Sequence, residues 1–499
     1  MSTSVRPLRR AAPPAWRPLA GTAGVVVAVL VLTSGGYGYH RDELYFLRAG
    51  RELAFGYVDQ PPLTPLVARA ASELFRESLV GLRLASALAA GMVVLLTGLL
   101  ARELGAGRAA QVLAAACMGV SAYLLAVGHL LSTSTFDLLA WTALCWLLVR
   151  ALPAGGPIWL AVGAVAGVAL QNKALPAFLL AAVVAALVVV GPRARLLDRY
   201  ALAGGAVALV IWAPHLAWQA AHGWPQLALS RAIAAGSSGT SEPWWLLLPY
   251  QLVLVGPLLV PVWAIGWWRL ARDPALRPWR AFALAYPLLA AIFMLTGGKP
   301  YYLAGMYPVL LAAGAAPVVG WARGRGRVVL LGAALAVTGA VNAVLVLPLV
   351  PVQHLADTPI VDIRYDTGET VGWPALVRTV ADVHAALPAA ERAAAVMLTR
   401  NYGQAGAVDR FGPALGLPTA YSGHNSYADW GPPPETTSTV IVVGYGRDEL
   451  ERWCGRVELA ARVDNGLDVD NDEQGTPVWV CRDRRVPWAE LWPELRRLG

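Results

Sequence analysis

Residues 40–63 read HRDELYFLRAGRELAFGYVDQPPL and directly follow the first long apolar run of the chain. The stretch combines acidic, basic and aromatic side chains and ends in a Pro-Pro pair. Charged side chains beside a membrane-like segment have two interpretations, because they form either a solvated, charge-paired cap or part of a site at the membrane surface. The rest of the chain is needed to choose between them.

The composition is typical of a membrane protein. The chain is 57% hydrophobic and 14% charged, with 20 Trp, whereas soluble domains are about 45–50% apolar and about 25% charged. The basic start resembles a signal peptide, with Arg6, Arg9, Arg10 and Arg17, but no clear small-residue cleavage site precedes Gly38. We therefore expect the first apolar run to be retained as a transmembrane helix.

Eleven apolar segments are long enough, or nearly long enough, to span a bilayer. They begin near residues 19, 79, 108, 132, 156, 174, 200, 244, 279, 301 and 327. At roughly 17–25 residues for each span, they predict an all-α polytopic bundle of about eleven helices over residues 1–350. The fifth segment, about 156–171, is short and rich in glycine, so the count is open by one.

The distribution of charge predicts the orientation in the membrane. With the N-terminus inside, the inner loops hold 17 basic residues and the outer loops hold 8. This bias fits the positive-inside rule, so we expect a plasma-membrane protein with a cytoplasmic N-terminus and an extracytoplasmic C-terminus. The basic excess belongs to membrane loops, and the chain has no basic aromatic stripe, which argues against nucleic-acid binding.

Residues 351–499 have a different character, with 14 basic and 21 acidic residues. Short apolar runs predict strands at 394–399, 438–444 and 477–481, and longer amphipathic patterns predict helices at 378–388 and 447–457. We therefore expect a small α/β domain. Cys454 and Cys481 lie in it and can form a disulfide if the domain is extracytoplasmic.

Three carboxylates of the first outer loop are candidates for chemistry. Asp42 and Glu43 lie at the membrane boundary, where partial desolvation tunes protonation and allows a carboxylate to accept a proton from a hydroxyl group. Asp59 lies 17 residues after Asp42 and precedes the helix-stopping Pro-Pro pair. Between them, residues 43–55 have the spacing of an amphipathic interfacial helix. A charge-paired cap explains the same residues equally well.

The lysines are unusually few. Only Lys173 and Lys299 occur among the 40 basic residues, and both fall in short loops on the predicted outer side. Their ammonium groups are suited to a lipid phosphate, although snorkelling at a helix end is the simpler explanation for either one alone. Asp137 lies near the outer end of the fourth span, and an intramembrane carboxylate is either a site residue or hydrogen-bonded to nearby hydroxyl groups.

Aromatic and histidine side chains complete the candidate set. His215 closes the seventh span and either binds a metal with Asp59, lines a sugar pocket or belongs to an interfacial aromatic belt. Tyr301 and Tyr302 follow Lys299, where their rings can stack on a sugar or lie at the membrane interface. The segment YSGHNSYADWGPPP (421–434), with His424 and Asn425, suits polar recognition, and a Pro-rich turn is the alternative.

An ordered set of motifs resembles a known family. DELYFLRAGRELAFGYVDQPPLTPL, STSTFDLLAW, LQNKALP, APHLAWQAAHGWP, GGKPYYLAGMYPVLL and NYGQAGAVDRFGP occur in order, with YSGHNSYADWGPP after them. Together they resemble bacterial members of the dolichyl-phosphate-mannose-protein mannosyltransferase family. The resemblance implies a GT-C fold, a sugar donor carried on a polyprenyl phosphate and no nucleotide cofactor.

The resemblance also implies roles for individual residues. It assigns the catalytic base to Asp42, with Glu43 as its neighbour. A related lipid A aminoarabinose transferase has Glu-Lys where this chain has Asp59 and Gln60, so the loop itself lacks a phosphate-binding lysine, and Lys173 and Lys299 become the expected anchors. Some relatives use a divalent metal, and the sequence leaves this open.

We therefore expect an inverting glycosyltransferase that moves mannose or a similar sugar from a polyprenyl phosphate to a protein, glycan or lipid acceptor. The alternative is a polytopic transporter or lipid flippase, with Asp137 and the outer lysines along its pathway. No paired inverted halves with matching broken helices are evident, which disfavours the alternative.

Overall fold

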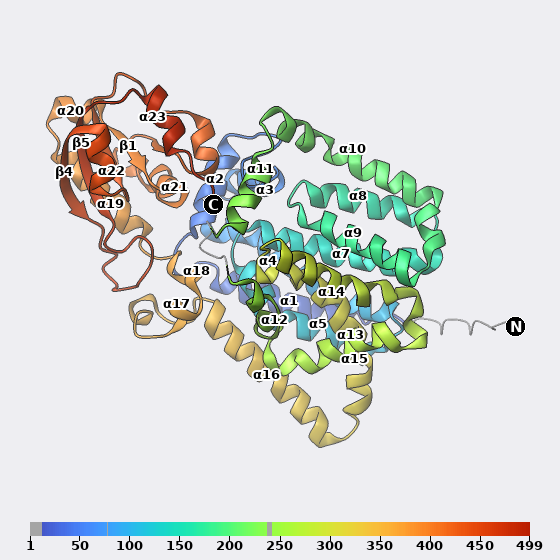
Figure 1. Cartoon of the computed structure of the whole chain (residues 1–499). Coiled ribbons are helices and arrows are strands. Elements are labelled where there is room, and N and C mark those ends of the chain that lie inside the picture. The colour runs from blue at the N-terminus through green and yellow to red at the C-terminus, as the bar shows by residue number, and fades with distance from the viewer. Residues whose placement is uncertain (1–11, 77, 237–241) are drawn as a thin grey trace, which may run out of the picture.

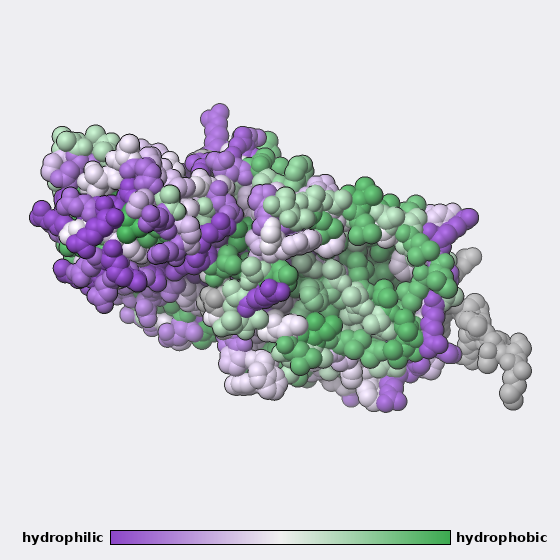
Figure 2. Space-filling model, turned by 45° about the horizontal axis from the view of Figure 1, so that its top comes forward, coloured by the Kyte–Doolittle hydropathy of each residue, from purple (hydrophilic) through white to green (hydrophobic). Residues whose placement is uncertain are grey.

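The computed structural model describes residues 12–76, 78–236 and 242–499, so Arg6, Arg9 and Arg10 of the basic start lie outside the described residues. The chain folds as a helical bundle followed by a smaller region that contains a sheet (Figure 1). Hydrophobic residues cover much of the surface of the helical bundle (Figure 2). Hydrophilic residues dominate the surface of the C-terminal region, at the left of the same view.

Within the described residues, seven helical segments are long and apolar enough to cross a membrane. They are α1 (Trp16–Thr33), α4 (Leu79–Glu103), α7 (Thr133–Ala154), α10 (Arg199–Ala221), Pro274–Leu295 with α14 (Arg280–Leu295), Pro300–Trp321 with α15 (Tyr307–Trp321), and α16 (Arg325–Val346). The polytopic membrane bundle predicted from the sequence is therefore confirmed.

Four further segments bear on the number of spans. Two bent pairs raise the number to nine if each crosses as one span: α5 (Arg108–Gly119) with α6 (Ala122–His129), bent by 60°, and Trp244–Val255 with Pro257–Arg272, bent by 86° and containing α12 (Leu247–Val255) and α13 (Val260–Arg272). Two shorter apolar helices are α8 (Ile158–Leu170) and α9 (Leu175–Val190). All eleven expected segments thus coincide with a helix or a bent pair, but the expectation of eleven spans stays a prediction.

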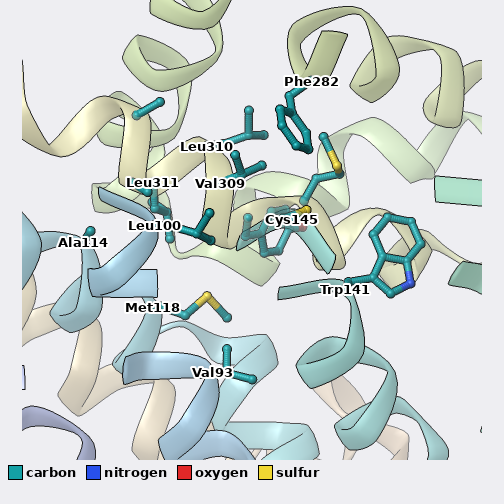
Figure 3. Close-up of a cluster of buried hydrophobic side chains, with 14 of the residues drawn as sticks. Val93, Leu100, Ala114, Met118, Trp141, Cys145, Phe282, Val309, Leu310 and Leu311 are labelled. Carbon is teal, nitrogen blue, oxygen red and sulfur yellow. The ribbon is translucent and has the colours of Figure 1, made fainter. Parts of the chain in front are cut away.

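The bundle core is built by apolar side chains from helices that are distant in sequence (Figure 3). The labelled residues come from α4, α5, α7, α14 and α15 and are Val93, Leu100, Ala114, Met118, Trp141, Cys145, Phe282, Val309, Leu310 and Leu311. Because these side chains face one another rather than lipid, they hold the ends of the helices, and the loops between them, in fixed positions.

Two helices of the first loop, α2 (Arg41–Arg51) and α3 (Leu63–Phe75), lie between α1 and α4 in sequence. The expected helix at 43–55 ends at Arg51 and does not have the single buried face of an interfacial helix. In the observed helix α2, seven of the eleven residues are buried, because α21 (Tyr402–Phe411) packs on it from the C-terminal region. This helix therefore packs mainly on other helices of the protein, whereas the sequence predicts a helix that lies in the membrane interface.

The C-terminal region contains a five-stranded sheet in the order β2-β1-β3-β5-β4. Strands β1 (Val396–Thr399), β2 (Ala420–Ser422) and β3 (Thr439–Val443) are parallel, and β5 (Pro477–Arg484) runs antiparallel to β3 and β4 (Cys454–Arg462). The helices beside the sheet are α19 (Trp373–Ala386), α20 (Ala389–Ala394), α21, α22 (Arg447–Trp453) and α23 (Trp488–Leu495). The short helices α17 (Ile360–Ile363) and α18 (Tyr365–Gly368) precede them in the chain. The expected α/β character is confirmed.

One expected helix is shorter than predicted. The segment 447–457 is helical only to Trp453, and Cys454 begins β4. The physical reason is pairing with β5, since Val457 lies opposite Cys481 in the ladder and a disulfide joins Cys454 to Cys481. The division at residue 350 stays a prediction.

Candidate active site

The first turn of α2 fixes the direction of two neighbouring carboxylates. His40 precedes the helix, and its Nδ1 accepts a hydrogen bond from the backbone N–H of Asp42 at 3.2 Å. Glu43 closes a capping box by accepting from the backbone N–H of His40 at 2.9 Å. Such reciprocal bonds satisfy the free amides of a helix start. Asp42 and Glu43 therefore leave the helix in different, defined directions.

Glu43 points into the bundle and is fully buried. Arg83 of α4 donates to both of its carboxylate oxygens, at 2.9 and 2.8 Å, and the backbone N–H of Leu131 donates to Oε1 at 2.9 Å. The same guanidinium donates to the carbonyl oxygens of Ser34 and Gly38 at 2.7 Å each. A buried ion pair is stable when its remaining polar groups are satisfied in this way. The geometry gives Glu43 a structural environment rather than a reactive one.

Asp42 has a more open environment, with 38% of its side chain exposed. The phenol of Tyr402, at the start of α21, donates to Oδ1 at 2.7 Å. The other oxygen, Oδ2, lies 3.9 Å from Nδ1 of His40, whose Nε2 lies 3.7 Å from Asp366. A partly exposed carboxylate with only one oxygen engaged by a hydrogen bond can accept a proton from a hydroxyl group.

Asp59 belongs to the same neighbourhood. Tyr45 of α2 donates to its Oδ1 at 2.7 Å, and the ring of Tyr45 lies 4.9 Å from that of Tyr402. Burial raises the pKa of Asp59 to about 7, and the charge of Asp42 contributes to the rise while the bond from Tyr45 opposes it. The two tyrosines thus connect Asp42 and Asp59, two of the three carboxylates predicted from the sequence.

Both lysines interact electrostatically with the carboxylate of Asp42. Burial lowers the pKa of Lys173, and the carboxylates of Asp137 and Asp42 oppose this effect. Burial also lowers the pKa of Lys299 to about 8, with a further lowering by the charge of Lys173. Asp42, Lys173 and Lys299 therefore lie within electrostatic range of one another.

Lys173 lies in a polar and aromatic environment. Its ammonium donates to Ser134 Oγ at 3.1 Å and lies 5.4 Å from the ring centres of both Tyr301 and Tyr302. Asp137 lies on the same helix as Ser134 and is buried, and its Oδ1 has no hydrogen-bond partner among the described residues. The predicted residues Asp137, Tyr301 and Tyr302 therefore surround one of the two phosphate-binding candidates.

Gln60 and His215 lie around the loop that carries Asp59. Gln60 is buried, and neither polar atom of its side chain has a partner among the described residues. His215 Nδ1 lies 2.9 Å from the carbonyl oxygen of Phe55, and its Nε2 lies 3.4 Å from Gln226 Oε1. His215 therefore anchors the loop to α10.

The pair predicted in the segment 421–434 contacts the last residue of the chain rather than the two carboxylates. His424 Nε2 lies 2.8 Å from the carbonyl oxygen of Gly499, and Asn425 Oδ1 accepts from its backbone N–H at 3.3 Å. The ring of His424 nevertheless lies 4.7 Å from that of Tyr402. His424 thus supports the position of Tyr402 through a ring contact.

The candidate metal ligands do not form a complete set. Asp59 Oδ1 accepts from Tyr45, and both nitrogens of His215 face protein oxygens. Within residues 12–76, 78–236 and 242–499, no group of three or more His, Cys, Asp or Glu side chains is arranged to hold a metal ion. Asp59 and His215 alone do not supply the three or more protein ligands of a zinc site.

Sequence reasoning missed His40, Tyr402 and Asp366. His40 lies in the stretch that opens the first loop, and Tyr402 lies in one of the motifs that carry the family resemblance. Neither motif indicates that Tyr402 reaches Asp42, 360 positions away in sequence. No signal in the sequence distinguishes Asp366 from other acidic residues of the C-terminal region.

Comparisons with known proteins bear on the family and the fold. Residues 59–218 match the model of the dolichyl-phosphate-mannose-protein mannosyltransferase family. No curated protein sequence matches the chain.

Among solved structures, ArnT from Cupriavidus metallidurans in the apo state is 15% identical with a TM-score of 0.59, covering 93% of this chain and 97% of ArnT. ArnT bound to undecaprenyl phosphate has the same identity and TM-score, covering 94% and 98%. The archaeal oligosaccharyltransferase AglB from Archaeoglobus fulgidus, in complex with an inhibitory peptide and a dolichol-phosphate, is 12% identical with a TM-score of 0.51, covering 86% of this chain and 69% of AglB.

At these identities the structural likeness shows the fold. The chain thus resembles the dolichyl-phosphate-mannose-protein mannosyltransferase family in sequence over residues 59–218 and has the GT-C fold of ArnT over nearly its whole length, as the sequence predicts.

Proposed function

We propose that the chain is a membrane glycosyltransferase that moves a sugar from a polyprenyl-phosphate donor to a hydroxyl group of a protein, glycan or lipid. The observation that carries the proposal is the partly exposed carboxylate of Asp42 within electrostatic reach of Lys173 and Lys299. Displacement at an anomeric carbon needs a base for the acceptor and a cation for the departing phosphate. The family match and the polyprenyl phosphates bound to ArnT and AglB support this class of donor.

The reaction that these groups support is a single displacement. Asp42 takes the proton of the acceptor hydroxyl group while its oxygen forms a bond to the anomeric carbon of the sugar. The bond between that carbon and the phosphate oxygen breaks, and the electron pair leaves on polyprenyl phosphate. Lys173 and Lys299 stabilise the added negative charge. Attack opposite the leaving group inverts the anomeric configuration.

The remaining candidates divide into two groups around this centre. Asp59, Gln60, Asp137, Tyr301 and Tyr302 contact the sugar or the phosphate, and the unpartnered polar atoms of Gln60 and Asp137 support that assignment. Glu43, His215, His424 and Asn425 hold the surrounding segments in place. The sugar is mannose or a similar hexose or pentose.

The orientation belongs to the same proposal. Counted along the sequence with eleven spans, the loops predicted on one side hold 17 basic residues and those on the other side hold 8, so the N-terminus is cytoplasmic and the site faces the extracytoplasmic side of the plasma membrane. Residues 1–350 form the transferase domain and residues 351–499 an extracytoplasmic domain. This places the acceptor outside the cytoplasm.

Turnover by the purified full chain tests the proposal. The chain in detergent micelles, without a membrane gradient, is given polyprenyl-phosphate mannose, glucose or arabinose together with a cell-envelope extract as the source of acceptor. Release of polyprenyl phosphate from at least one donor, lost in Asp42→Asn, is expected. No release from any of them would contradict the proposal and favour a carrier, which moves its substrate without cleaving it. Mass spectrometry of surface glycans in a deletion strain then identifies the sugar.

A further inference from the structure

Tyr402 joins the C-terminal region to the loop that carries the proposed base. It begins α21, where Asn401 caps the helix by accepting from the backbone N–H of Gln404 at 2.8 Å. From there its phenol donates to Asp42 Oδ1 at 2.7 Å. This bond comes from outside the membrane bundle, so the surroundings of Asp42 are complete only when α21 is docked.

The ring of Tyr402 has three close neighbours. The ring centre of Tyr45 lies at 4.9 Å and that of His424 at 4.7 Å, and the guanidinium of Arg41 lies at 6.0 Å. Ring pairs at these separations stabilise a fixed arrangement. Burial and the charge of Asp42 raise the pKa of Tyr402 well above its usual value, so the phenol stays protonated and donates.

Two glycines allow the close approach of α21 to α2. A Cβ atom at Gly403 would lie 2.8 Å from Cβ of Arg41, and one at Gly406 would lie 2.8 Å from Cβ of Leu44. Both distances are shorter than any normal carbon contact, so a side chain at either position would push the helices apart. The packing that brings Tyr402 to Asp42 therefore depends on small residues one turn apart.

We infer that Tyr402 is a positioning residue for the transfer reaction: its phenol holds Oδ1 of Asp42 and leaves Oδ2 to receive the proton of the acceptor. This inference rests on the proposed function. It makes the C-terminal region a part of the active site, because this region supplies the group that orients the base. A bond that only docks the two parts of the chain would affect stability and leave the rate unchanged.

The chain offers a matched control for this bond. Tyr427 is buried in the C-terminal region, and its phenol donates to Asp409 Oδ2 at 2.9 Å. Tyr402→Phe and Tyr427→Phe each remove one phenol oxygen that donates to an aspartate and keep the ring. Only Tyr402→Phe alters the surroundings of Asp42.

The experiment measures polyprenyl phosphate release by the full chain from the donor that the wild type uses best among polyprenyl-phosphate mannose, glucose and arabinose. In Tyr402→Phe we expect kcat to fall about tenfold, the magnitude of one hydrogen bond to a charged group. The donor KM should stay within about twofold, because the phosphate-binding lysines are unchanged. Tyr427→Phe should retain the wild-type kcat, and both variants should unfold at similar temperatures.

The outcomes separate this inference from the proposed function. If Tyr402→Phe keeps the wild-type kcat while Asp42→Asn abolishes release, the positioning role is wrong and the proposed function stands. If Asp42→Asn also keeps full activity, the proposed base is wrong and the inference fails with it. Equal losses of kcat in Tyr402→Phe and Tyr427→Phe would reduce the bond to a structural contact.

Discussion

Helix α2 offers two different surroundings to the two acidic residues of its first turn. Towards the bundle, Glu43 is fully buried and accepts from Arg83 and two backbone amides. Towards the C-terminal region, Asp42 is 38% exposed and accepts one side-chain hydrogen bond, from Tyr402. Neighbouring carboxylates with the same intrinsic chemistry thus receive a closed and a partly open environment, because the number of satisfied oxygen lone pairs differs. Our proposal assigns the reactive role to the open one.

The largest expected effect is the loss of transfer rate when Asp42 is substituted. Asp42→Asn keeps the shape of the side chain and removes the basic oxygen, so the transfer rate should fall about a thousandfold, the middle of the range for a general base. Release of polyprenyl phosphate by the purified chain checks the rate. The unfolding temperature should stay near that of the wild type, and a rate within tenfold of the wild type would contradict the role of Asp42.

Substitution of Glu43 should lower the stability of the fold. Glu43→Gln removes the charge that compensates Arg83, and an uncompensated buried charge costs about 3 kcal/mol or more. Thermal unfolding in detergent should therefore occur at a clearly lower temperature than in Asp42→Asn. Adding Arg83→Met, which removes the second charge, should recover part of the loss. Equal unfolding temperatures of Glu43→Gln and Asp42→Asn would contradict the structural role of Glu43.

The third prediction concerns the pH dependence of the transfer reaction, which we expect to reflect the charge of Lys299. Because the pKa of Lys299 is about 8, its ammonium is present below that pH and is lost as the pH rises through it. The value of kcat/KM for the donor should therefore fall above about pH 8. Lys299→Arg should extend the plateau, since a guanidinium stays charged, and Lys299→Ala should raise the donor KM about tenfold. A pH profile unchanged in Lys299→Arg would exclude Lys299 from phosphate binding.

The smallest expected effect concerns the hydrogen bond from Tyr45 to Asp59. Tyr45→Phe removes the bond that lowers the pKa of Asp59, so that pKa should rise above about 7. If ionised Asp59 contacts the substrate, the acid limb of the kcat/KM profile should move to higher pH by less than about one unit. An unchanged acid limb would mean that the ionisation of Asp59 does not affect transfer.

Much of the fold follows from local properties of the sequence. Each of the eleven apolar segments coincides with a helix or a bent helix pair, because span length and composition are local requirements of the bilayer. The strands at Val396–Thr399, Thr439–Val443 and Pro477–Arg484 also follow from short apolar runs. The helix expected through residue 457 ends early, because pairing of β4 with β5 is a non-local contact.

The sequence by itself determined which groups are available for chemistry: one acidic loop, two isolated lysines and their predicted common side of the membrane. Only the tertiary structure decided the surroundings of each group. Asp42 and Glu43 are adjacent and carry the same local signals, and Arg83 and Tyr402 lie 40 and 360 positions from their respective partners. Burial and hydrogen-bond saturation depend on such distant contacts, and these two quantities separate a structural carboxylate from a reactive one.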